Sequence, residues 1–182
     1  MSEALEQLVE LTLESVELGN LTPIVLIDGR AGSGKSTLAE ALKNRLFKEG
    51  ESLPRVIHMD DLYEGWRGLE AGADILRRLI LSPLAKGVGA SWQEWDWALG
   101  ERNKWREFRG GTPLIIEGCG ALNRASAEHS DLRVWLEVPE DVRFERWVAR
   151  EGSSEHWAEW SAQELEFYAR ERSAELANLT FG

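Results

Sequence analysis

The chain has 182 residues and a formal net charge of −11, so we predict one domain spanning residues 1–182. No apolar run is long enough to cross a bilayer, which argues against a membrane protein. The net charge would repel a phosphate backbone, and the lysines and arginines are scattered, so no nucleic-acid partner is expected.

The hydrophobic pattern predicts strands and helices that alternate along the chain. An amphipathic helix packed outside the core is expected over residues 3–18, within an N-terminal helical segment 1–20. The apolar, β-branched run 24–27 predicts a central parallel strand covered on both faces, and residues 35–48 predict the helix after it. Further strands are expected at 55–59, 114–117 and 133–138, and further helices at 74–85, 122–128, 140–150 and 161–176. This alternation predicts an α/β fold with a parallel, doubly wound sheet flanked by helices.

Two segments are harder to assign from their pattern. Residues 87–111 show neither a clear helical nor a clear strand period. The tail 178–182 is compatible with a final strand and with a frayed end.

The segment from Gly29 to Ser36 matches the pattern GxxxxGK[ST] without a gap, between a predicted strand and a predicted helix. Its glycines let the backbone turn so that N–H groups face inward at the positive end of a helix, which makes a nest for phosphates. Lys35 is expected to reach the β- and γ-phosphates of ATP as a catalytic group, Ser36 to ligate Mg²⁺, and Thr37 to donate to the α-phosphate. The predicted nucleotide-binding residues are Gly29, Arg30, Ala31, Gly32, Ser33, Gly34, Lys35, Ser36 and Thr37. The alternative is a glycine-rich turn with an incidental lysine.

Acids at the ends of two other predicted strands face this loop in an open α/β sheet. Asp60 is predicted to be the catalytic base, which orients a hydroxyl acceptor and takes its proton. Asp61 and Tyr63 are predicted to bind the substrate. The alternatives are a role for Asp61 in holding magnesium-bound water, a capped loop for the two acids, and simple packing for Tyr63. Glu117 ends an apolar run in the manner of a Walker B strand and is predicted to face the Mg²⁺ ion, the alternative being a surface cap.

Three arginines after the fourth predicted strand recur at three- and four-residue spacing. Arg143, Arg146 and Arg150 would share one helical face, which is a suitable grip for phosphates. We predict a small helical lid over residues 140–160, with Arg146 as its catalytic member and residues 152–154 as a joint. The alternative is a solvated helix whose arginines pair with nearby glutamates.

Nine tryptophans in 182 residues are a large excess. Several of them fall between the acceptor segment and the third predicted strand, namely Trp66, Trp92, Trp95, Trp97 and Trp105. Their flat surfaces are suited to stacking on a ring, although packing in a core is the more common use of an indole.

Three segments, GRAGSGKST, MDDLY and LIIEG, resemble the group of uridine kinase, phosphoribulokinase and pantothenate kinase. The resemblance implies a nucleoside-monophosphate-kinase-like P-loop fold with a lid, Asp60 as the catalytic base and Tyr63 near the acceptor. The segment Trp95, Asp96 and Trp97 is similar to the Tyr-Asp-Phe segment that lines the nucleoside site of uridine kinases, which adds these residues to the predicted substrate site. The histidine that follows in that family is matched here by Gly100, so uridine itself is not predicted.

Together these features predict an ATP- and Mg²⁺-dependent phosphotransferase acting on a hydroxyl of a small molecule, such as a nucleoside. The alternative is a P-loop ATPase or switch without a small-molecule acceptor, although the guanine-reading NKxD and DxxG patterns of switch GTPases are missing from the sequence. The single Cys119 and the lack of an export signal predict a cytoplasmic protein. The sequence leaves the oligomeric state open.

Overall fold

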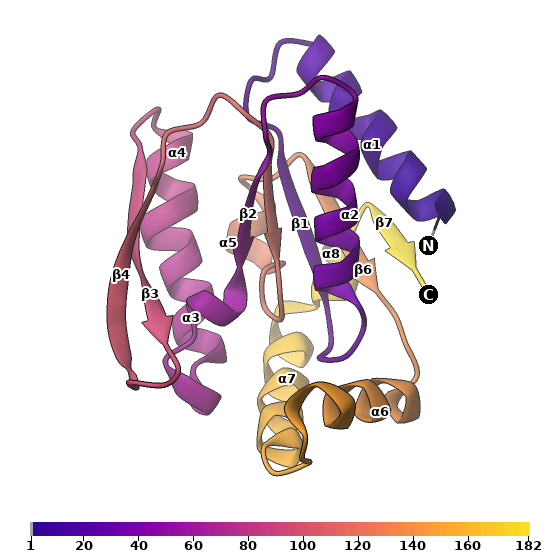
Figure 1. Cartoon of the computed structure of the whole chain (residues 1–182), viewed down its shortest axis with the longest axis vertical. Coiled ribbons are helices and arrows are strands. Elements are labelled where there is room, and N and C mark those ends of the chain that lie inside the picture. The colour runs from indigo at the N-terminus through magenta and orange to yellow at the C-terminus, as the bar shows by residue number, and fades with distance from the viewer. Residues whose placement is uncertain (1) are drawn as a thin grey trace.

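A five-stranded parallel sheet forms the centre of the computed structural model, which describes residues 2–182 (Figure 1). The strands pair in the order β2-β5-β1-β6-β7. They are β1 (Ile24–Gly29), β2 (Arg55–His58), β5 (Leu114–Glu117), β6 (Leu132–Leu136) and β7 (Leu179–Phe181). The predicted parallel sheet with a central first strand is confirmed, and the C-terminal tail supplies an edge strand.

Helices flank the sheet on both faces. They are α1 (Ser2–Glu17), α2 (Lys35–Lys48), α3 (Leu69–Ile75), α4 (Ser82–Ala85), α5 (Arg124–Ala127), α6 (Glu140–Glu151), α7 (Trp157–Glu171) and α8 (Ser173–Leu176). The 3₁₀ turns η1 (Met59–Asp61) and η2 (Gly65–Arg67) follow β2, and the π-helical segment η3 (Leu76–Leu81) joins α3 to α4 in one continuous helical run. No helix in residues 2–182 is long and apolar enough to cross a membrane.

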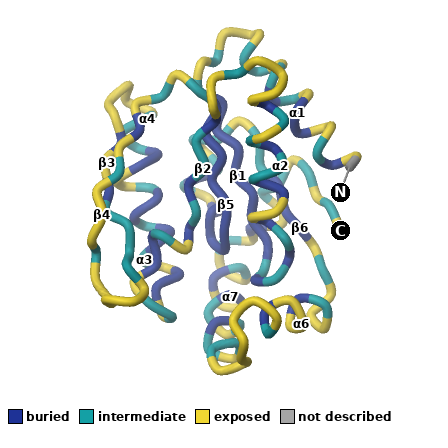
Figure 2. Tube along the Cα trace, viewed as in Figure 1, coloured by how far each residue is buried: buried dark blue, intermediate teal, exposed yellow. Residues whose placement is uncertain are grey.

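The central strand β1 is buried on both faces, as a strand between two layers of helices must be (Figure 2). Val25 and Ile27 pack into a cluster with α1 and α2, whereas Ile24 and Leu26 pack into the cluster on the opposite face. We expected α1 to pack outside the core, and this expectation was wrong. Leu8 of α1 is fully buried within the first cluster, so α1 belongs to the core of that layer.

The unassigned residues 87–111 form an antiparallel hairpin of β3 (Ala90–Asp96) and β4 (Glu101–Phe108). This hairpin stands beside the helical run α3–α4, away from the main sheet (Figure 1). Trp92 is 2% exposed and anchors the hairpin in the core cluster. The strand period was hard to see because β4 is polar or charged at most positions and mostly solvent-accessible.

The sheet topology gathers the predicted functional segments at one edge. The carboxyl ends of β1, β2 and β5 point the same way, because these neighbouring strands are parallel. The helices α6 and α7 lie beyond this edge and are joined through Gly152, whose φ is +75° (Figure 1). The fold therefore places residues 140–160, the predicted lid, over the ends of these strands.

Candidate active site

The segment between β1 and α2 forms a tight loop, which we call the phosphate loop (residues 29–36). Gly29, Gly32 and Gly34 all have positive φ, a conformation that disfavours side chains. A Cβ at Gly32 would lie 2.4 Å from the carbonyl oxygen of Arg143, so the loop and α6 are in contact at this point. The loop borders a cavity of about 640 Å³ through Ala31, Gly32, Gly34, Lys35 and Ser36, and the next residue, Thr37, borders it as well.

Replacing Gly32 by alanine is expected to weaken ADP binding and to lower the free energy of unfolding by about 2 kcal/mol, because the added carbon strains a positive φ and pushes α6 away. Calorimetric titration with ADP and urea unfolding would measure the two effects. Gly111→Ala is the matched control, since Gly111 also has a positive φ of +85° but has no atom within 4 Å of the added carbon. Equal effects in both variants would contradict a role for the contact with α6.

Lys35 lies at the start of α2 with its ammonium group folded back onto the loop. Its Nζ donates to the carbonyl oxygens of Gly29 at 2.8 Å and Arg30 at 3.1 Å. Burial disfavours the charge, but neighbouring acidic groups, Cys119 and Glu117 first among them, raise the pKa of Lys35 above its ordinary value. The side chain is therefore a buried cation beside the cavity.

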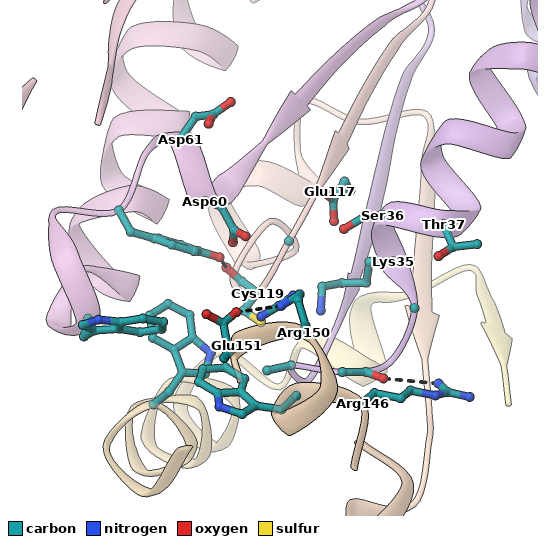
Figure 3. A pocket seen from close by; sticks show the side chains of 18 of the residues that line it. Lys35, Ser36, Thr37, Asp60, Asp61, Glu117, Cys119, Arg146, Arg150 and Glu151 are labelled. Atoms are coloured by element: carbon teal, nitrogen blue, oxygen red, sulfur yellow. Dashed lines mark hydrogen bonds and ion pairs between the residues drawn. The ribbon is translucent and has the colours of Figure 1, made fainter. Parts of the chain in front are cut away.

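Asp60 lies in η1, directly after β2, and reaches the same cavity from the opposite wall (Figure 3). The surrounding protein and the negative charge of Glu117 raise the pKa of its carboxyl group. A carboxylate with a raised pKa is the better proton acceptor, which suits a general base. Asp61 also borders the cavity, but its carboxylate points away from Asp60 and Lys35 (Figure 3).

Glu117 ends β5 and is 4% exposed. It stands opposite His58 in the β2–β5 register, and Nδ1 of His58 donates to its Oε1 at 2.6 Å, a bond that raises the pKa of the histidine. Sequence reasoning assigned His58 no role, because this pairing depends on the strand register.

Oxygen ligands for a magnesium ion are available beside the phosphate loop. Glu117 and the Ser36 hydroxyl project toward the same part of the cavity (Figure 3). No group of three or more His, Cys, Asp or Glu side chains within residues 2–182 is arranged to hold a metal.

The three predicted lid arginines have different environments. Arg146 and Arg150 border the cavity, and Nη1 of Arg146 donates to the carbonyl oxygen of Gly32 at 3.2 Å (Figure 3). Arg143 is 3% exposed and donates instead to the carbonyl oxygens of Val138 and Ala31. The expectation that all three guanidinium groups share one open face is therefore corrected, since Arg143 is buried beneath the loop.

Aromatic side chains form another wall of the cavity. Trp97 borders it together with Trp66, and the two ring centroids lie 5.0 Å apart. The indole nitrogen of Trp97 donates to the backbone oxygen of Asp60 at 2.9 Å, so the hairpin is tied to the acceptor segment. Tyr63 also borders the cavity but is buried, and its hydroxyl donates to the carbonyl oxygen of Cys119.

Two predicted substrate residues do not reach this wall within the described part of the chain. Trp95 lies against the Arg102 guanidinium, 5.9 Å from ring centroid to carbon. The carboxylate of Asp96 accepts hydrogen bonds from the backbone of Ala98 and Leu99 in the hairpin turn. The cavity therefore takes only Trp97 from this segment.

A family model described as AAA domain matches residues 25–168, which include the phosphate loop, both acids and the lid segment. The chain belongs to this AAA domain family. It shares the P-loop NTPase fold, and the predicted kinase-like P-loop architecture is confirmed.

Relatives of this AAA domain carry kinase names. A protein named cytidylate kinase from Thermococcus sibiricus is 29% identical over 159 residues, which cover 84% of this chain and 70% of the relative. A solved structure of a possible uridine kinase from Bacillus stearothermophilus shares the fold, with a TM-score of 0.68, 20% identity and coverage of 98% and 100% of the two chains. A candidate fructose transport system kinase from Silicibacter sp. TM1040 does so with a TM-score of 0.65, 23% identity and 98% coverage of each chain.

The AAA domain also holds an acid at the end of β1 that sequence reasoning missed. Asp28 is fully buried and accepts hydrogen bonds from the backbone of Gly29, Gly120 and Leu122 and from the Tyr168 hydroxyl. Burial raises its pKa to about 7, although the bond from Tyr168 acts in the opposite direction. Asp28 thus fastens the turn after β5 to the strand that leads into the phosphate loop.

We expect Asp28 to make stability depend on pH. Its pKa of about 7 in the folded state exceeds the ordinary value of 3.8, so the folded state binds the carboxyl proton of Asp28 more tightly than the unfolded state does. The resulting stabilisation is present below about pH 4 and is lost as the pH rises through about 7. As the pH rises from 4 to 8, the free energy of unfolding of Asp28→Asn should therefore increase relative to that of wild type by on the order of 4 kcal/mol. Urea unfolding of both proteins across this range would test the prediction, and parallel curves would contradict it.

Proposed function

We propose that this AAA domain is an ATP-dependent phosphotransferase that moves the γ-phosphoryl group of ATP to a hydroxyl of a small molecule. The observation that supports it most directly is one cavity bordered by the phosphate loop on one side and by Asp60 on the other. A nucleotide whose phosphates lie on the loop would point its terminal phosphate toward Asp60. The wall of Trp66 and Trp97 beside Asp60 offers room for the acceptor.

The proposed reaction uses these side chains in fixed roles. Asp60 takes the proton of the acceptor hydroxyl while its oxygen forms a bond to the γ-phosphorus and the bond to the β–γ bridging oxygen breaks, releasing ADP. Lys35 and Arg146 offset the negative charge that collects on the transferred group and on ADP. Ser36 and Glu117 would hold a magnesium ion, which would supply additional charge neutralisation.

A hydroxyl acceptor fits the cavity better than the phosphate acceptor that the name cytidylate kinase implies for the relative. A phosphate oxygen is already ionised near neutral pH and needs no base, whereas a hydroxyl does. The acceptor wall carries Asp60, and its carboxylate would repel the phosphate of a nucleoside monophosphate. The cations that border the cavity are Lys35 at the start of α2 and Arg146 and Arg150 on α6.

The proposal is tested by ADP release from Mg²⁺-ATP with acceptors in pairs that differ only by a phosphate, such as cytidine against cytidine monophosphate and fructose against fructose 6-phosphate. Acceptor-dependent release with a member that lacks the phosphate is the expected result. Release that requires the phosphate, with the new phosphoryl group attached to that phosphate in the product, would replace the hydroxyl by a phosphate acceptor. Release at the same rate without any acceptor would instead support the ATPase or switch alternative.

A further inference from the structure

A buried carboxylate from α7 lies directly behind the phosphate loop. Glu164 is fully buried, and its Oε1 accepts the backbone N–H of Ala31 at 2.6 Å. The same carboxyl group accepts from Nε of Arg30 at 3.1 Å, from the thiol of Cys119 at 3.1 Å and from the indole N–H of Trp160 at 3.1 Å. One acid therefore joins the loop, the segment after β5 and helix α7.

Arginines from α6 hold the neighbouring loop carbonyl groups. Nη1 of Arg143 donates to the oxygen of Ala31 at 3.3 Å, and Nη1 of Arg146 donates to the oxygen of Gly32 at 3.2 Å. The peptide groups of Ala31 are thus fixed on both sides, its N–H by α7 and its C=O by α6. Because these two carbonyl oxygens accept hydrogen bonds from α6, the remaining loop amides can face a phosphate.

Stability alone gives a weak reason for this arrangement. A buried carboxylate costs desolvation energy, and a buried ion pair often contributes no more than a well-packed apolar pair. The Arg30 side chain is 19% exposed and the Glu164 side chain 0%, so the acid bears most of this cost. The negative charge of Glu164 also helps to keep the neighbouring Lys35 cationic. Both effects act on groups that bind phosphates.

We infer that Glu164 is a positioning residue for nucleotide binding, which sets the shape of the phosphate loop and fastens it to the α6–α7 pair. The side chain acts through Ala31, Arg30 and Lys35 and does not border the cavity. This inference rests on the proposed nucleotide site. It predicts that the loop loses its binding geometry when the carboxylate is replaced, even where the fold is kept.

The test compares Glu164→Gln and Glu164→Ala with wild type by calorimetric titration of ADP and by steady-state kinetics with Mg²⁺-ATP. Loss of hydrogen bonds to a charged group should weaken ADP binding about 10-fold in Glu164→Gln and more in Glu164→Ala. The KM for ATP should rise by a similar factor, while the KM for the acceptor should rise less, because Glu164 bonds directly to the phosphate loop but meets the acceptor wall only through Trp160. A role in folding alone would not separate the two KM values.

Glu166→Gln is the matched control, since Glu166 lies on the same helix but is exposed. Unfolding temperatures of all variants identify any that fail to fold. If Glu164→Ala fails to fold, the result for Glu164→Gln decides the test. Wild-type ADP affinity in folded Glu164→Gln would overturn the inference. If wild type itself binds no ADP, the proposed function fails instead, so the two failures are distinguishable.

Discussion

Asp60→Asn is expected to lower kcat about 100-fold or more while leaving ATP affinity close to that of wild type. The side chain approaches the cavity from the wall opposite the phosphate loop, so its amide replacement keeps the shape of the site but cannot take a proton. Single-turnover transfer and calorimetric ATP titration would separate the two effects. A turnover equal to wild type would refute the assignment of Asp60 as the base.

The pH dependence provides a second test of the same residue. Because desolvation by the surrounding protein and the charge of Glu117 raise the pKa of Asp60, kcat/KM of wild type should fall as the pH drops through this raised pKa, where the base becomes protonated. The acid limb assigned to Asp60 should be missing from the residual activity of Asp60→Asn. Glu64→Gln is the control for loss of a nearby charge, since Glu64 follows on the same segment, pairs with Arg102 and does not border the cavity. Equal losses of kcat/KM in Asp60→Asn and Glu64→Gln would indicate that the removed negative charge, and not a base at Asp60, accounts for the effect.

Elements with a strong local signal were predicted well from the sequence. The helix at 35–48 and the strand at 114–117 match α2 and β5 residue for residue, because an apolar period or run coincides there with glycine or proline boundaries. The phosphate loop was equally readable, since its glycines and Lys35 are required by local backbone geometry. Asp60 and Glu117 followed from the rule that parallel strands end at a common edge.

The remaining features depend on contacts between distant segments. Spacing placed Arg143, Arg146 and Arg150 on one face but does not say which member is covered, and Arg143 packs beneath the loop. Glu164 sits in a helix rich in glutamate and reads as a surface residue, although it is fully buried. His58 meets Glu117 only through the β2–β5 register. A buried polar side chain of this kind becomes visible only when its partners are placed.

Lys35→Ala is expected to lower kcat by about 10²–10³-fold and to weaken ATP binding more than ADP binding. The ammonium group donates to the carbonyl oxygens of Gly29 and Arg30, and phosphate oxygens would replace these acceptors when a nucleotide binds. The terminal phosphate would lose its nearest cation in the variant. Calorimetric titration with ATP and with ADP, alongside transfer kinetics, would measure the change.

Lys43→Ala is the matched control, because Lys43 lies on the same helix and pairs with Glu40 outside the cavity. Undiminished transfer in Lys35→Ala would remove the phosphate-loop assignment, whatever the outcome for Asp60. The two catalytic variants also differ in hydrolysis without acceptor. Asp60→Asn should keep any slow reaction with water that needs no base, whereas Lys35→Ala should lose it, because charge on the γ-phosphoryl group must be offset in both reactions.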